Sequence, residues 1–392
     1  MAGLVRKAAV SLFLCVGAVG GYAAEVVAQD APDSRPSVKG GFEDRPFITR
    51  AGNTRIGGYA EVHLRFERVD GINEALTFDP KRFNLFTYTV VSDRVRVASE
   101  LEFEEGGEEI KLEMAFIDFE IHPAFTFRGG IILSPLGRFN LSHDSPVNDL
   151  TDRPLVSTQI IPTALSEAGM GFFGAMYPTP SSRISYEFYG VNGFSDGVIL
   201  SDPAGTRIAA GKGNFEDNNQ RPSWVGRLAI SPQPNWELGG SFHTGPYNVW
   251  KADGLTIDAK RGLTILALDW NGIWKSFELL GEYAKAEIDV PLESAIFQAN
   301  QQGFYGQINA HFGRGWLTAL PESVFTGVVR VGAVDFDADT TGDSHRRLTL
   351  GLNFRPHEDT VFKFDYQRNW ERDPFNNEVR GASFLFSVAT YF

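Results

Sequence analysis

The chain has 392 residues and a formal charge of −13 at pH 7, from 36 Lys and Arg against 49 Asp and Glu. This acidic balance argues against nucleic acid as a partner. Phe and Gly are abundant, with 32 and 41 copies, whereas Cys occurs once and Met four times. Such a composition favours strands and turns, and no apolar run after the N-terminus is long enough for a membrane-spanning helix. One Cys excludes a disulfide framework.

The first 28 residues are predicted to be a secretory signal peptide. Arg6 and Lys7 form its positive start, the apolar run follows over 8–21, and small residues precede the expected cleavage site. The single Cys15 lies within that run. Residues 29–53 are polar and broken by Pro and Gly, so we expect a flexible periplasmic lead-in there.

From residue 54 to residue 392, segments of about ten residues alternate apolar with polar or small side chains. In one of them, Leu348 and Leu350 oppose Thr349 and Asn353. The expected strands, about sixteen in number, cover residues 54–68, 83–91, 94–104, 110–121, 125–139, 169–177, 183–194, 223–231, 236–248, 262–271, 276–289, 303–312, 324–337, 346–355, 361–370 and 380–392. Period two alone does not say which face is inside, and 110–121 and 262–271 do not sort into two faces.

The connections between these segments differ systematically in length. Short turns such as Ser92-Asp93 alternate with longer polar loops such as "GINEALTFDPK", residues 71–81. Short turns on one side and long loops on the other are typical of outer-membrane barrels and not of soluble β-sandwiches. Together with the export signal, this asymmetry predicts an all-β fold, a transmembrane antiparallel β-barrel of about sixteen strands, with the apolar face outside.

The final strand, 380–392, carries apolar side chains on one face up to the terminal Phe392. It must pair with the first strand, because unpaired backbone in hydrocarbon costs several kcal/mol per group. A strand that ends in Phe also resembles the signal by which the barrel-assembly machinery recognises outer-membrane proteins. We therefore expect that machinery as a partner.

The third long loop, near 141–167, is longer than a hairpin requires. We expect it to fold inward and narrow the lumen, so that Asp144, Asp149, Asp152 and Arg153 meet a permeating solute at close range. Alternatively, the loop only covers the mouth of the barrel.

Two stretches resemble the phosphate-selective porins O and P. One is "GIILSPLGRFN", residues 130–140, followed by "DRPLV", residues 152–156; the other is "LTLGLNFRPHEDTVFKFDYQ", residues 348–367. The resemblance implies a trimeric, sixteen-stranded outer-membrane channel with an inward third loop, an arginine ladder and a lysine cluster in the lumen. This chain departs from that pattern, because acids are mixed with the arginines and the constriction segment has no lysine cluster.

Nine charged residues are expected to line the pore or its constriction. They are Arg65, Arg96, Glu100, Arg128, Arg138, Asp144, Asp149, Asp152 and Arg153. Arg128 and Arg138, before the third loop, are the strongest candidates. In the competing interpretation, opposite charges on neighbouring strands only pair across the sheet.

We therefore expect a homotrimeric porin in the cell outer membrane of a Gram-negative bacterium, surrounded by lipid and lipopolysaccharide. It would let small hydrophilic solutes, including anions such as phosphate, diffuse passively, without enzymatic activity, metal or cofactor. The alternative is a structural or adhesive barrel with an occluded lumen. An outer-membrane phospholipase using His143 and Ser145 is a weaker hypothesis. Trp residues near strand ends are expected to form interface girdles.

One acidic segment is a candidate cation site. Asp335, Asp337 and Asp339 alternate, with Asp343 nearby, as carboxylates around Ca²⁺ would. The segment lacks the glycine and closing acid of a calcium loop, so a solvated acidic tip is the favoured interpretation.

Overall fold

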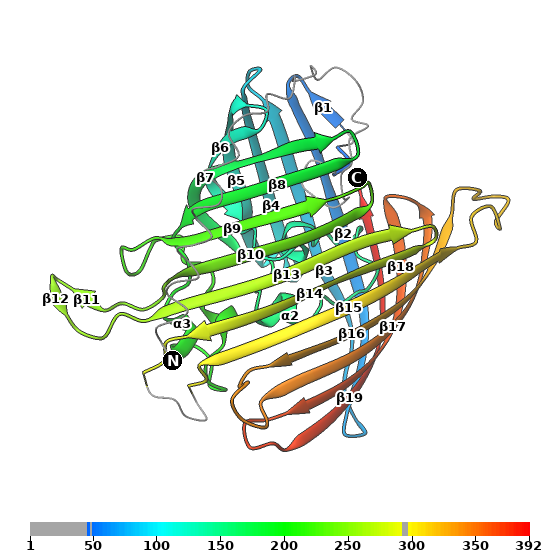
Figure 1. Ribbon diagram of the computed structural model, residues 1–392. Helices are drawn as coiled ribbons and strands as arrows, with labels where there is room; N and C mark the ends of the chain where they lie inside the picture. Colours follow the sequence, from blue (N-terminus) through cyan, green and yellow to red (C-terminus); the bar gives the residue numbers. More distant parts are fainter. Residues whose placement is uncertain (1–44, 48, 292–296) are drawn as a thin grey trace. The chain divides into compact units, whose positions relative to one another are not determined.

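The computed structural model describes residues 45–47, 49–291 and 297–392, and the expected signal peptide lies outside these ranges. Within them the chain forms one closed antiparallel β-barrel of sixteen strands (Figure 1), which confirms the predicted fold class. The strands are β2 (Thr54–Val69), β3 (Ile72–Val90), β4 (Val95–Glu104), β5 (Glu109–His122), β6 (Phe125–Leu133), β7 (Ser166–Thr179), β8 (Ser182–Val191), β9 (Ser223–Ser231), β10 (Trp236–Pro246), β13 (Gly262–Trp274), β14 (Phe277–Ile288), β15 (Asn300–Phe312), β16 (Val324–Asp335), β17 (Ser344–His357), β18 (Thr360–Arg372) and β19 (Glu378–Tyr391). The last strand pairs with the first, from Gly381 opposite Val69 to Tyr391 opposite Tyr59, which closes the sheet.

Short elements decorate the connections. They are β1 (Thr49–Ala51), η3 (Glu105–Gly107), η4 (Phe139–Leu141), α2 (Val156–Gln159), α3 (Gly197–Leu200), η5 (Ile208–Gly211) and the hairpin of β11 (Lys251–Ala252) and β12 (Leu255–Thr256). In the described part of the chain, no helix has the length and apolar character needed to cross a membrane.

The barrel is apolar outside and polar on much of its inner wall. On β17, Leu350 is 44% exposed whereas Thr349 and Asn353 are fully buried. On β19, Phe384 is 60% exposed and Ser387 is fully buried. Period two therefore separates an outward apolar face from an inward polar face, and this polarity is the reverse of that of a soluble barrel.

The segment 71–81, expected to be a loop, continues the first hairpin instead. β3 begins at Ile72, so the turn is confined to Asp70 and Gly71. Leu76 lies opposite Phe66, and this apolar cross-strand pair outweighs the loop-forming Asn, Asp and Pro of the segment.

The expected lead-in over 29–53 is described from residue 45, except for residue 48. Residues 49–51 form β1, which pairs with the start of β2. Arg45 is only 7% exposed. A short strand pairing and a buried charge therefore hold the end of this segment against the barrel.

The strand expected over 125–139 ends earlier, at Leu133. Pro135 follows and has no N–H to continue a ladder. The side chain of Asn140 donates to the carbonyls of Ser134 and Leu165, at 2.8 and 3.1 Å. These bonds tie both ends of the third loop together and turn the chain away from the sheet, so that Arg138 lies in the loop.

The side chains of residues 110–121 do not alternate regularly between an apolar and a polar face, because the pairing register of this strand shifts. Glu100 pairs with Met114 and Leu101 pairs with Leu112, so Glu113 is an extra residue in β5. Ile110 faces outward before this bulge and Ile117 faces outward after it. A β-bulge switches the parity of a strand, and here it buries Glu113 inside the barrel.

Residues 262–271 also lack a regular alternation of apolar and polar side chains, but for a different reason: both faces of this strand are apolar. Leu266 and Leu268 point outward and are 57% and 59% exposed. Leu263 and Ile265 point inward and are buried in an apolar cluster formed with side chains of the loops. The inner wall of β13 is therefore covered by protein.

Candidate functional site

The connection between β6 and β7, residues 134–165, lies inside the barrel, and we call it the inner loop. It contains η4 and α2, and α2 is visible through the barrel wall in Figure 1. On one side, Gly137 N donates to Ser241 Oγ of β10 at 2.9 Å, and Ser157 Oγ donates to Glu282 of β14 at 2.8 Å.

On the other side, the inner loop is bonded to β15 and to β17 through β19. Asp149 accepts hydrogen bonds from Asn309 at 2.8 Å and from Arg355 at 2.9 Å. The backbone N–H of Thr151 donates to Asp365 at 2.7 Å. The loop therefore lies within the lumen and is bonded to the wall at several strands, from β10 round to β19.

A buried lysine adds a further anchor. Lys363 of β18 is fully buried, and its Nζ donates to the carbonyl of Ser145 at 2.8 Å. The hydroxyl of Ser145 donates to Glu61, which also bonds His63 at 2.6 Å. A buried charge costs free energy unless it is paired, so this network holds the loop in one position.

An apolar cluster fills part of the lumen. The inner loop contributes Ile160 and Ile161, and the fourth long loop, residues 192–222, contributes Val198 and Ile208. They pack against inward side chains of several strands, including those of β13. Water is therefore excluded from this part of the barrel, and any aqueous path runs elsewhere.

The polar part of the lumen holds a cavity of about 1540 Å³ between the inner loop and the wall. Among the described residues that line it are eleven Lys or Arg and seven Asp or Glu. The lining is thus basic although the whole chain carries a charge of −13. Walls with one sign of excess charge raise the local concentration of ions of the opposite sign, here anions.

A second cavity of about 140 Å³ lies next to the first, and Arg347 lines both. Near Arg347, Asp152 of the inner loop accepts hydrogen bonds from Arg65 at 2.6 Å and from Gln367 at 3.0 Å, and it lies 3.5 Å from Arg347. Arg330 donates to its backbone carbonyl. The cluster around Asp152 therefore marks the boundary between the two cavities.

Asp152 is held in its charged form. Burial opposes ionisation, but Arg65 and Arg347 outweigh burial and lower the pKa of Asp152 to about 2. The Asp152 carboxylate thus faces two arginines at the boundary, and Arg330 binds the backbone carbonyl of the same residue.

Five of the nine expected pore residues line the large cavity: Arg65, Arg138, Asp149, Asp152 and Arg153. The other four do not. Arg96 pairs with Glu120 at 2.8 Å, and Glu100 and Asp144 are buried in an ionic cluster around Arg45.

Arg128, expected to be a strong pore candidate, is instead bound to the wall. It donates two hydrogen bonds to Asp118, at 2.7 and 2.8 Å. Its guanidinium lies 3.9 Å from the centroid of Phe116 and 4.3 Å from that of Phe173. For Arg128, therefore, the charge pairs with an opposite charge on the neighbouring strand.

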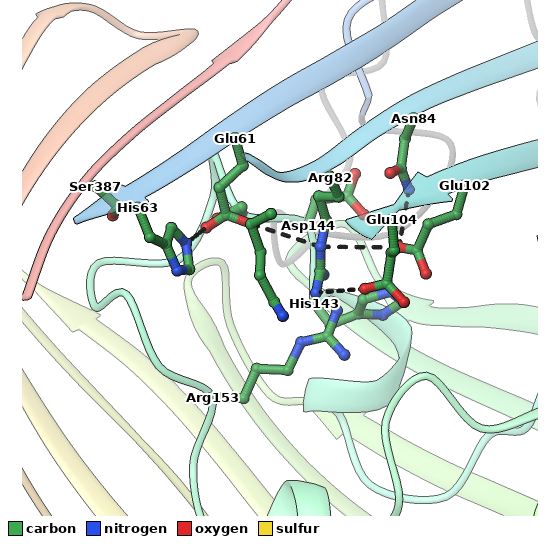
Figure 2. A network of polar contacts seen from close by, with 12 residues as sticks. Glu61, His63, Arg82, Asn84, Glu102, Glu104, His143, Asp144, Arg153 and Ser387 are labelled. Carbon is green, nitrogen blue, oxygen red and sulfur yellow. Dashed lines mark hydrogen bonds and ion pairs between the residues drawn. The ribbon is translucent and has the colours of Figure 1, made fainter. Parts of the chain in front are cut away.

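Figure 2 shows the network of polar contacts that adjoins the ionic cluster around Arg45. Side chains of β2, β3 and β4 point toward His143 and Asp144 of the inner loop, with Arg153 alongside. Arg82 lies 3.1 Å from Glu104 and 3.6 Å from Glu61. Sequence analysis missed two members of the wider cluster. Arg45 precedes the first strand, and Glu113 is revealed only by the parity switch within 110–121.

His143 and Ser145 are not bonded to each other. His143 Nδ1 lies 2.8 Å from the carbonyl of Asn140 and its Nε2 lies 2.8 Å from Glu113. The hydroxyl of Ser145 donates to Glu61. Because a serine nucleophile requires a base at its hydroxyl, the structure does not assemble the catalytic pair considered for a phospholipase.

The acidic segment 335–343 is tied by hydrogen bonds. Arg207 donates to Asp343 at 2.7 Å, and Asn300 donates to Asp339 at 2.7 Å. Among the described residues, no group of three or more His, Cys, Asp or Glu is placed to hold a metal ion.

The chain matches no protein-family model. It is 28% identical over 359 residues to an uncharacterized protein of Aquifex aeolicus (strain VF5), covering 84% of this chain and 78% of that protein.

Solved structures share the fold. The outer membrane channel DcaP of Acinetobacter baumannii aligns over 86% of this chain and 97% of its own, with a TM-score of 0.57 and 11% identity. OprB of Pseudomonas putida aligns over 87% and 94%, with a TM-score of 0.55 and 10% identity. An anion-selective porin from Comamonas acidovorans aligns over 86% and 99%, with a TM-score of 0.53 and 10% identity. The chain therefore has a porin-type barrel fold.

Proposed function

We propose that this protein is an outer-membrane porin through which small hydrophilic solutes, and anions in preference to cations, diffuse passively. The observation that carries the proposal is the basic, water-accessible cavity inside a barrel with an apolar exterior. Exposed side chains such as Leu350 and Phe384 favour a lipid environment, and exposed Trp236 and Trp274 near strand ends suit its interfaces.

The proposed path follows the wall of β17, β18, β19 and β2. The large cavity, the cluster around Asp152 and the small cavity succeed one another along this wall. Arg65, Arg330 and Arg347 would there replace part of the hydration shell of an anion. The resemblance to phosphate-selective porins supports phosphate as one of the solutes. The same resemblance supports a homotrimer embedded in lipid and lipopolysaccharide.

Planar-bilayer recording tests the proposal. Purified protein should give stable current steps that are linear in voltage, and the reversal potential in a salt gradient should have the sign of an anion-preferring channel. Correctly folded protein that gives no current steps would contradict a channel.

An occluded structural barrel is the second candidate, because the inner and fourth loops fill part of the lumen with apolar side chains. Liposome swelling distinguishes it from the porin. Small sugars and organic anions should enter liposomes that contain the porin, whereas liposomes that contain the occluded barrel should stay impermeable.

A further inference from the structure

The chain segment that precedes the barrel enters its mouth. Phe47 packs edge-on against Phe86 of β3, with ring centroids 5.4 Å apart, and lies 6.0 Å from Tyr88. Gly57 of β2 makes room, since a Cβ there would lie 2.5 Å from the Phe86 ring and 2.9 Å from the carbonyl oxygen of Pro46. The segment is therefore seated against the inner wall.

Arg45 of this segment joins the inner loop to the wall. Its two terminal nitrogens contact Glu100 of β4 and Asp144 of the inner loop, both at 2.5 Å. The guanidinium lies 5.1 Å from the centroid of Phe86. The second oxygen of Asp144 accepts a hydrogen bond from Tyr391 at 2.9 Å. These contacts therefore link the segment before the barrel, β4, the inner loop and β19.

The surroundings of Arg45 are rich in buried carboxylates. Glu100 is fully buried, Asp144 is 3% exposed and Glu113 is 4% exposed. Glu113 Oε1 lies 2.8 Å from Nε2 of His143. Buried carboxylates that are ionised repel one another unless a cation lies among them.

His143 does not supply that cation. Its Nδ1 faces the carbonyl of Asn140, which only accepts, so Nδ1 carries the proton of the neutral ring. Nε2 lies 2.8 Å from Glu113 and can only accept there, so Glu113 carries the proton between them and is itself neutral. Burial and the nearby Arg153 lower the pKa of His143 to about 4, so the ring is neutral at pH 7.

We propose that Arg45 is a positioning residue of the channel: it holds the inner loop against the barrel wall, as the fixed counter-cation of Glu100 and Asp144, and we call this contact the latch. The proposal rests on the proposed channel function for its effect on conduction. Without Arg45 the acids repel, the loop leaves the wall near Asp144, and unpaired negative charge faces the solute path.

The test compares Arg45→Gln with Arg45→Lys and with the control Arg50→Gln. Arg50 lies in β1, is exposed, and donates to the carbonyl of Gly52 at 2.8 Å, so its loss should change nothing. Each variant also carries Ser142→Cys, a cavity-lining position that is 8% exposed. We measure single-channel current noise and the rate of thiol labelling by a small methanethiosulfonate reagent.

Arg45→Gln should add subconductance states and speed labelling about tenfold or more, because hydrogen bonds to charged groups are worth at least that factor. Arg45→Lys should fall between it and the wild type. The double variant Arg45→Gln with Glu100→Gln should recover most of the wild-type behaviour, a rescue that a general packing defect would not show.

Asp144→Asn removes the charge that Arg45 contacts on the inner loop, so it should change current noise and the labelling rate in the same direction as Arg45→Gln. This second variant keeps the test decisive if Arg45→Gln does not fold. Wild-type noise and labelling rates in both variants would overturn the latch. Faster labelling in a barrel that never conducts would overturn the channel but keep the latch.

Discussion

The charge of Asp152 at the boundary of the two cavities gives the sharpest test of the proposed path. Asp152→Asn keeps the shape of the side chain and its oxygen acceptor for Gln367, but it removes the negative charge that faces Arg65 and Arg347. The positive charges of Arg65 and Arg347 then act on a passing ion without a neighbouring negative charge to offset them.

The size of the effect follows from Coulomb's law. A unit charge about 4 Å from a permeating ion contributes about 1 kcal/mol in water. The contribution has opposite sign for anions and cations, so the anion-to-cation permeability ratio should change by about 2 kcal/mol, or about thirtyfold. If the ion passes farther from the charge, or if salt screens the charge, the anion-to-cation permeability ratio should change by about fivefold.

The assay is the reversal potential across a planar bilayer in a tenfold salt gradient. Asp152→Asn should shift it toward the anion equilibrium potential. Asp253→Asn, the same change in the turn between β11 and β12, is the matched control and should leave it unchanged. A ratio that changes less than twofold in Asp152→Asn, in a barrel that folds, would refute the path along this wall.

Three further outcomes are expected. Leu350→Arg, in the middle of the outward face of β17, should lower the free energy of unfolding in lipid vesicles by about 2–4 kcal/mol, and a change near zero would place that face in water. Val198→Asp puts a charge into the apolar cluster, so the fourth loop should leave the lumen and single-channel conductance should rise; an unchanged current would show that this loop does not limit the path. The pKa of Asp152 is about 2 in the folded chain, below its usual value of about 4. Its contribution to loop anchoring should therefore be complete above about pH 4 and lost as the pH falls through about 2, and wild type and Asp152→Asn should converge in thermal unfolding there.

The site was only partly accessible to sequence reasoning. Period two places Arg65 and Arg128 alike on the inner face, yet Arg65 lines the cavity and Arg128 is bound to Asp118. The difference depends on which acid the neighbouring strand presents, and that depends on register. Glu113 was hidden because one inserted residue reverses the parity of β5.

The barrel itself follows from the sequence. Alternation along each strand and the lengths of the turns are local properties, and a sheet with one apolar face and no free edge has few solutions in lipid. The position of the inner loop, in contrast, does not follow from local properties of the sequence. Whether residues 134–165 cover the mouth or lie within the lumen depends on contacts such as those of Asp149 with Asn309 and Arg355, more than 150 residues away. Such contacts can form only once the barrel has closed. The tertiary structure therefore decided where the charges that control the proposed path lie.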